Sequence, residues 1–79
     1  MSPTKAARMV EKMVSIAIED GVRDRQQLAH ALALAGECRR RVEARIESGL
    51  VQRDEAAACA RRIRRAESKL ARLLEEVEE

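Results

Sequence analysis

The strongest constraint on the fold is a regular series of apolar residues in the last third of the chain. Successive members are separated alternately by three and four positions: Ala56, Cys59, Ile63, Ala66, Leu70, Leu73 and Val77. This spacing places all seven on one side of an α-helix, in the pattern by which helices pack in coiled coils. It predicts a helix over about residues 53–77, whose apolar side must be covered by at least one other helix.

A second helical pattern occupies the middle of the chain. Asp24 followed by Gln27 is an acidic version of the capping box that begins a helix. Apolar residues then recur every three or four positions, at Leu28, Ala31, Ala35, Cys38, Val42 and Ile46. Gly49 with Leu50 behind it is typical of a helix end, where glycine adopts positive φ and the next residue makes a hydrophobic contact. These features predict a helix over about residues 25–48.

Gly36 lies inside this predicted helix. Glycine costs up to about 1 kcal/mol relative to alanine in a helix interior. It therefore either permits the close approach of a neighbouring helix or marks a break. We expect close approach, because the residues around Glu37 do not form a new helix cap.

The N-terminal segment predicts a third, shorter helix over about residues 4–20. Ser2 before Pro3 is a recognised helix start, and Gly21 is a suitable end. Apolar residues recur at helical spacing between them, at Met9, Val10, Met13, Val14 and Ala17. A strand from residue 14 to 18 is the alternative, but it would have no second strand to pair with.

Together these patterns predict an all-α fold in which residues 1–79 form one domain. The two longer helices have similar lengths and a short joint, so they should form an antiparallel, coiled-coil-like hairpin. A chain of 79 residues with no aromatic side chain and fourteen alanines has a thin core. Such a chain buries only roughly 60 to 65% of its unfolded surface, which indicates that a partner or a second copy completes the fold.

No catalytic, cofactor-binding or metal-binding residue is predicted. His30 is the only histidine, and no Asp, Glu or Cys lies four residues before or after it. Cys38 and Cys59 lack the paired spacing of a metal site. We expect two free, buried thiols, with a disulfide as the alternative if the two Cα atoms lie within about 7 Å.

The chain shows neither the apolar core of a secretory signal nor an apolar run long enough for a membrane span. We therefore expect a cytoplasmic protein. The net charge of +2 hides an uneven distribution. Residues 37–72 carry eleven basic and six acidic side chains, whereas residues 73–79 carry four glutamates and no basic residue. These glutamates oppose the helix dipole, so the last few residues should fray.

Eight arginines gather around the middle of the predicted hairpin and form a basic patch. They are Arg39, Arg40, Arg41, Arg45, Arg61, Arg62, Arg64 and Arg65. A solvated face, a surface for an acidic protein and a nucleic-acid surface all remain open interpretations. The interleaved glutamates favour the solvated face, and the absence of aromatic residues argues against base stacking.

The hairpin from Arg39 to Leu74 resembles the small co-chaperones that accompany needle subunits in bacterial type III secretion. The resemblance rests on residues in both helices and at the turn, namely Glu37, Cys38, Arg39, Arg40, Gly49, Leu50, Ala66, Glu67, Leu70 and Leu73. It implies a cytoplasmic co-chaperone whose apolar hairpin face contacts a second chaperone. The resemblance also implies that the protein helps to keep a needle subunit monomeric.

The sequence thus predicts a non-catalytic protein that offers an apolar face to a partner helix. The predicted contact residues are Met9, Met13, Ile16, Ile63, Leu70 and Leu73. Homodimerisation through the series from Ala56 to Val77 is compatible with this function. The alternatives are a nucleic-acid-binding or regulatory protein that uses the arginines, or a small phage or mobile-element inhibitor of a host complex.

Overall fold

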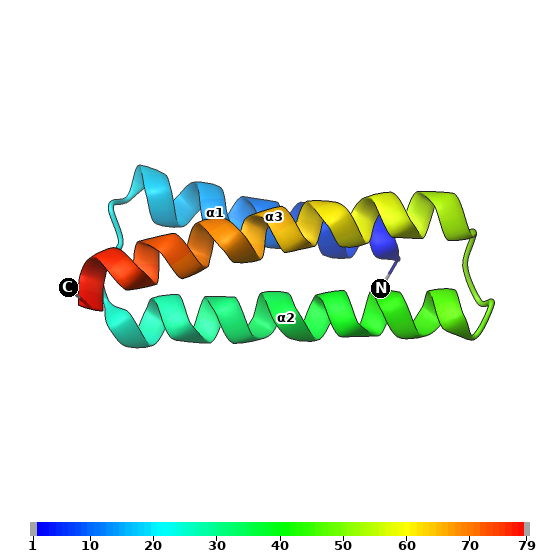
Figure 1. Ribbon diagram of the computed structural model, residues 1–79. Coiled ribbons are helices and arrows are strands. Elements are labelled where there is room, and N and C mark those ends of the chain that lie inside the picture. Colours follow the sequence, from blue (N-terminus) through cyan, green and yellow to red (C-terminus); the bar gives the residue numbers. More distant parts are fainter. Residues whose placement is uncertain (1, 79) are drawn as a thin grey trace.

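A computed structural model describes residues 2–78 and contains three α-helices in this range. They are α1 (Pro3–Glu19), α2 (Arg25–Glu47) and α3 (Arg53–Glu78). Figure 1 shows them side by side in an elongated bundle of 41 × 18 × 16 Å. Helices α1 and α3 run in the same direction and α2 runs against them. The all-α prediction, the antiparallel hairpin of α2 and α3, and the three helix positions to within two residues are confirmed.

Both ends of α1 are formed by the residues that the sequence indicated. Ser2 accepts a hydrogen bond from the backbone N–H of Lys5 at 3.2 Å, and Pro3 occupies the first turn. At the other end Gly21 has φ +61°, and the N–H of Val22 reaches back to the carbonyl of Ala17 at 2.9 Å. This is a Schellman motif, which satisfies carbonyls that the helix itself leaves free. The alternative strand over residues 14–18 is excluded.

Helix α2 begins and ends in the same manner. The side chain of Asp24 accepts a hydrogen bond from the N–H of Gln27 at 3.0 Å. Gly49 has φ +74°, and the N–H of Leu50 bonds to the carbonyl of Arg45 at 3.1 Å. The expected hydrophobic contact of Leu50 is not made to any great extent, because this side chain is 71% exposed.

Gly36 does not break α2, which is continuous across it. The residue is buried, and a Cβ atom at this position would lie 3.3 Å from Nη1 of Arg40 and 3.5 Å from Oε2 of Glu67. Glu67 belongs to α3, so the neighbouring helix reaches Gly36 only with the end of a side chain, and no backbone atom of α3 lies within 4 Å of this Cβ position. The approaching atoms belong to side chains.

Helix α3 extends to Glu78 and carries Asp54 and Glu55 in its first turn, where acidic side chains favour the helix dipole. The expected fraying of the acidic end is not seen up to Glu78, and Glu79 lies outside the described residues. Arg25 of α2 pairs with Glu78 at 3.3 Å. This contact places a positive charge beside the acidic end and connects it to the start of α2.

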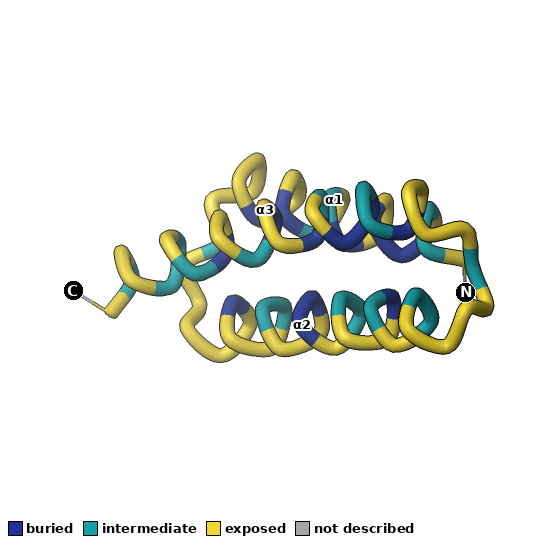
Figure 2. The backbone as a smooth tube through the Cα atoms, turned by 45° about the vertical axis from the view of Figure 1, so that its right-hand side comes forward, coloured by how far each residue is buried: buried dark blue, intermediate teal, exposed yellow. Residues whose placement is uncertain are grey.

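Helix α3 packs against both other helices, whereas α1 and α2 touch each other least. Buried segments of all three helices lie on the sides that face their neighbours (Figure 2). The buried hydrophobic residues of the core are alanines, larger aliphatic residues and one cysteine. They are Ala6, Ala7, Val10, Val14, Ala17, Leu28, Ala35, Val42, Ala56, Cys59, Ala60, Ile63, Ala66 and Leu70. Helix α1 thus packs on the hairpin and supplies five of these residues.

Candidate functional site

A groove with a volume of about 620 Å³ lies between α1 and α2. We call it the α1–α2 groove. Its lining is mainly apolar, with a few charged side chains from α2: Pro3, Ala6, Met9, Leu34, Glu37, Cys38, Arg41, Val42, Ala44 and Arg45. The groove follows from the packing, because α3 holds α1 and α2 while these two helices make little contact with each other.

A smaller hollow of about 210 Å³ lies between the other halves of α1 and α2. Met13 and Ile16 of α1 line it, together with Leu28 and Ala31 of α2. Both hollows lie between the same two helices, at different positions along the bundle. Three of the predicted contact residues line them, Met9 in the first and Met13 and Ile16 in the second.

Exposure differs among these three predicted contact residues of α1. Met9 is 39% exposed and Ile16 is 45% exposed, whereas Met13 is half-buried against the core. A methionine side chain is unbranched and flexible, so it adapts to the shape of a partner. Met9 and Ile16 are therefore accessible to another molecule.

The predicted contact residues of α3 require a correction. Ile63 and Leu70 are fully buried in the core, so they cannot touch a partner while the bundle is closed. Leu73 is half-buried and lines a shallow hollow near the end of α1. The series from Ala56 to Val77 is covered by α1 and α2, and a homodimer through it would require the bundle to open.

Leu34 is a groove residue that the sequence interpretation missed. It is 37% exposed and lines the groove beside Cys38. The available signal was its position four residues before Cys38, which places both side chains on neighbouring turns of the same helix side. This side of α2 lines a groove only because α1 packs beside it, and the sequence of α2 alone does not indicate where α1 packs.

The predicted basic patch is partly neutralised by glutamates between α2 and α3. Arg39 donates from Nε to Oε1 of Glu67 at 2.6 Å and from Nη1 to Oε1 of Glu43 at 2.9 Å. Arg64 of α3 reaches the same Glu43 at 3.3 Å. The hydrogen bonds that Arg39 donates to Glu67 and Glu43 raise the pKa of Arg39, and the bond that Glu43 accepts from Arg39 lowers the pKa of Glu43.

A second ion pair joins α1 to α3. Arg62 donates from Nε to Oε2 of Glu11 at 3.0 Å, and its Nη2 contacts the other carboxylate oxygen. The hydrogen bonds that Arg62 donates to Glu11 lower the pKa of Glu11 and raise the pKa of Arg62. On α2, Arg41 pairs with Glu37 at 2.8 Å.

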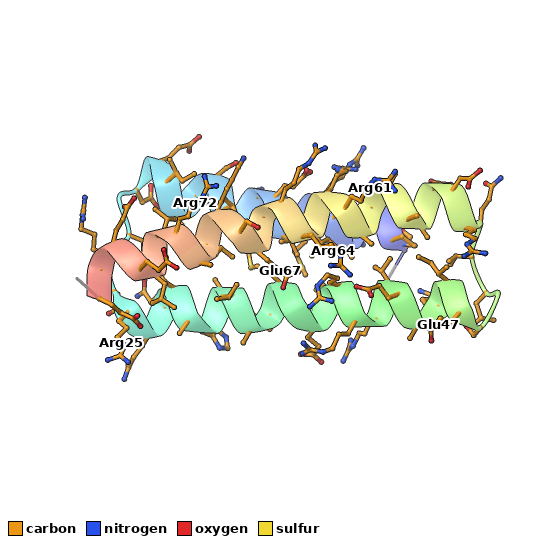
Figure 3. All side chains as sticks on the ribbon, viewed as in Figure 1. Arg25, Glu47, Arg61, Arg64, Glu67 and Arg72 are labelled. Atoms are coloured by element: carbon orange, nitrogen blue, oxygen red, sulfur yellow. The ribbon has the colours of Figure 1, made fainter. Side chains whose placement is uncertain are left out.

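The eight arginines therefore do not form one free patch. Arg39, Arg41, Arg62 and Arg64 are paired with glutamates. In Figure 3, Arg64 and Glu67 lie between α2 and α3, whereas Arg61 lies on the side of α3 away from α2. Arg40, Arg61 and Arg65 form no ion pair with any residue in the range 2–78. Arg45 lines the groove.

Neither cysteine forms a disulfide. Cys59 is buried, with Sγ 3.9 Å from Oγ1 of Thr4, and Cys38 is half-buried in the groove lining. His30 is exposed on α2. Among residues 2–78, no group of three or more His, Cys, Asp or Glu side chains is arranged to hold a metal ion.

No protein family, curated protein or solved structure matches this chain. Within the part of the chain that the structure describes, no helix has both the length and the apolar character needed to cross a membrane.

Proposed function

We propose that this protein is a non-catalytic interaction module that binds one helix of a partner protein in the α1–α2 groove. The observation that carries the proposal is the apolar floor of this groove, which includes the exposed side chains of Met9 and Leu34. Met9 and Leu34 keep 39% and 37% of their surface in water, and so forgo about two-fifths of the roughly 1.5 to 3 kcal/mol that full burial of each side chain contributes. A partner that covers them recovers this free energy.

A helix suits the groove better than an extended segment. The groove is formed by side chains of two antiparallel helices and offers no free backbone edge for strand pairing. A fourth helix laid between α1 and α2 would complete a four-helix arrangement, with apolar side chains spaced by three and four residues along the contact.

The resemblance to type III secretion co-chaperones supplies the first partners to test. A helical chaperone or a needle subunit of such a system would place an apolar helix side in the groove, and the protein would act in the bacterial cytoplasm. A second copy of this chain is the other partner to test, because two grooves could cover each other.

Site-specific photo-crosslinking in the native host tests the proposal. A photoreactive phenylalanine derivative replaces Leu34 in the groove in one variant and Leu50, which is 71% exposed outside it, in a matched control. We expect one protein to crosslink at position 34 and not at position 50. The identified protein is then purified and must bind the wild-type chain and fail to bind the Leu34→Glu variant.

Crosslinks of equal yield at both positions, or unchanged binding by Leu34→Glu, would contradict the proposal. Sedimentation of the pure protein identifies the case in which the partner is a second copy. In that case the wild type sediments as a dimer and Leu34→Glu as a monomer.

A further inference from the structure

A row of basic residues lies along α3 outside the core. Arg61, Arg65, Lys69 and Arg72 follow one another at intervals of four, four and three residues, and all four are exposed. This spacing places them on successive turns of one side of the helix. Figure 3 shows Arg61 and Arg72 on the side of α3 away from α2. We call these four residues the α3 basic row.

The side chains of the α3 basic row have no carboxylate partner within ion-pair distance among residues 2–78. The side chains of Arg61, Arg65 and Arg72 form no ion pair or hydrogen bond with a residue in the range 2–78. Lys69 acts on Glu11 only at longer range, where its charge helps to lower the pKa of that carboxyl. Arg62 and Arg64, by contrast, are each bound to a glutamate of another helix.

A hollow of about 340 Å³ between α1 and α3 borders the row. Arg65 and Lys69 line this hollow, and the hydroxyl-bearing Ser15 lies on the α1 side. Glu11 also lines it, but its carboxylate is held by Arg62. The hollow therefore presents cations and a hydroxyl to an anion beside the helix.

We infer that the α3 basic row binds the phosphate backbone of double-stranded nucleic acid. From Arg61 to Arg72 the row extends over about 16 Å at 1.5 Å per residue. This length corresponds to about five base pairs at 3.4 Å each, so the four cations can reach phosphates over about half a turn of the duplex. Such contacts do not read base sequence.

The chemistry of the row favours this ligand over other polyanions. The apolar side of α3 is buried in the core, so the helix has no apolar face to insert into a membrane. The bordering hollow adds Ile18 as its one large exposed apolar side chain, which is a small anchor for a protein interface. The chain has no aromatic residue on which single-stranded bases could stack.

This site is separate from the α1–α2 groove. None of the four residues lines that groove, and Arg61 and Arg72 lie away from α2. A partner helix in the groove and a nucleic acid on α3 could therefore bind at the same time. The inference that α3 binds nucleic acid therefore does not depend on whether a partner helix binds in the groove.

Fluorescence anisotropy with a labelled 20-base-pair DNA duplex at 20 to 200 mM salt tests the inference. Four phosphate contacts predict a slope of about −3.6 for the logarithm of the binding constant against the logarithm of salt concentration. The row variant combines Arg61→Gln, Arg65→Gln, Lys69→Gln and Arg72→Gln. We expect it to lose most of the affinity at 20 mM salt, because each replacement lowers the magnitude of the slope by about 1.

A control variant removes four other exposed cations, by Lys5→Gln, Arg23→Gln, Arg40→Gln and Arg53→Gln. It loses the same net charge and should keep a slope near that of the wild type. Circular dichroism first establishes that both variants remain helical. No duplex binding at 20 mM salt, or equal losses in both variants, would overturn the inference. So would tight binding to phosphatidylserine vesicles without binding to the duplex.

Discussion

Arg39 and Glu67 connect the two long helices through a hydrogen-bonded ion pair of 2.6 Å between Nε and Oε1. Both side chains are about four-fifths buried, with 22% and 20% exposed. Arg39 also holds Glu43 on its own helix at 2.9 Å, and Glu43 is shared with Arg64 of α3. The pair is therefore the centre of a small charge network across the hairpin.

We expect Glu67→Gln to lower the free energy of unfolding by about 1 kcal/mol. The Arg39–Glu67 pair is partly shielded from water, and in the variant Arg39 still has its ion pair with Glu43. Urea unfolding of Glu67→Gln, Arg39→Met and the double variant gives the coupling free energy of the pair. Arg40→Met, next to Arg39 but without an ion-pair partner, is the control and should change stability by less than 0.5 kcal/mol. A coupling energy of zero would contradict the role given to the pair.

Acid should weaken the bundle through the carboxylates of Glu11 and Glu43. The pKa of each is lowered in the fold from the usual value of 4.5, chiefly by hydrogen bonds from Arg62 and Arg39 respectively. The unfolded chain then takes up protons at a higher pH than the fold, so this stabilisation is present above about pH 4.5 and is lost as the pH falls below it. Urea unfolding between pH 7 and pH 3 should show a smaller acid loss for Glu43→Gln than for the wild type. An identical acid loss in both proteins would be inconsistent with this assignment.

Gly36→Ala should stabilise the protein by about 0.5 to 1 kcal/mol, because alanine is the better helix former. The new Cβ meets only the ends of the Arg40 and Glu67 side chains, which can move aside. Gly49→Ala should destabilise by about 1 kcal/mol, since its φ of +74° strains a residue with a Cβ. Thermal unfolding of the two variants should therefore shift in opposite directions. A loss of stability in Gly36→Ala would indicate that the Arg39–Glu67 pair does not tolerate the displacement.

Leu70→Ala should cost about 2 to 5 kcal/mol, because Leu70 is fully buried between the helices. Leu70→Asp should unfold a bundle of this size altogether. Leu50→Asp is the matched control, and its exposed side chain predicts a change within about 0.5 kcal/mol. Circular dichroism with urea compares all three. A folded Leu70→Asp variant with unchanged stability would contradict the core assignment.

The local structure was predictable because its determinants lie close together in the sequence. Asp24, Gly21 and Gly49 mark helix ends through contacts within a few residues, and the spacing from Ala56 to Val77 defines the buried side of α3. The functional surfaces were less predictable, since they depend on where α1 packs. Ile63 is buried by α1 and α2 of the same chain. The three-and-four spacing would be the same if a partner helix covered Ile63, so the sequence did not distinguish the two arrangements.

The charges were equally ambiguous in the sequence. Glu67 and Glu11 lie 28 and 51 residues from the arginines that they bind, so no local pattern indicated which arginines were neutralised. Lys69 and Arg72 were not recognised as members of a basic row because the arginine-rich stretches on both helices dominated the pattern. Only the arrangement of α3 in the bundle separates its outer side from the side that faces α2.

The two cysteines should differ in reactivity in the folded protein. Cys38 is half-buried in the groove lining, whereas Cys59 is buried in the core. N-ethylmaleimide should therefore modify Cys38 at least tenfold faster than Cys59, as followed by mass spectrometry of the peptides. Equal rates under native conditions would show that the groove is closed or the core open.

The same thiol provides the most direct test of the proposed function. Labelling of Cys38 is measured in a Cys59→Ala variant, with and without a saturating amount of the purified protein that crosslinks at position 34. If a partner helix fills the α1–α2 groove, the labelling rate of Cys38 should fall at least tenfold when the complex forms. An unchanged rate in a complex that demonstrably forms would contradict the proposal that this groove is the binding site.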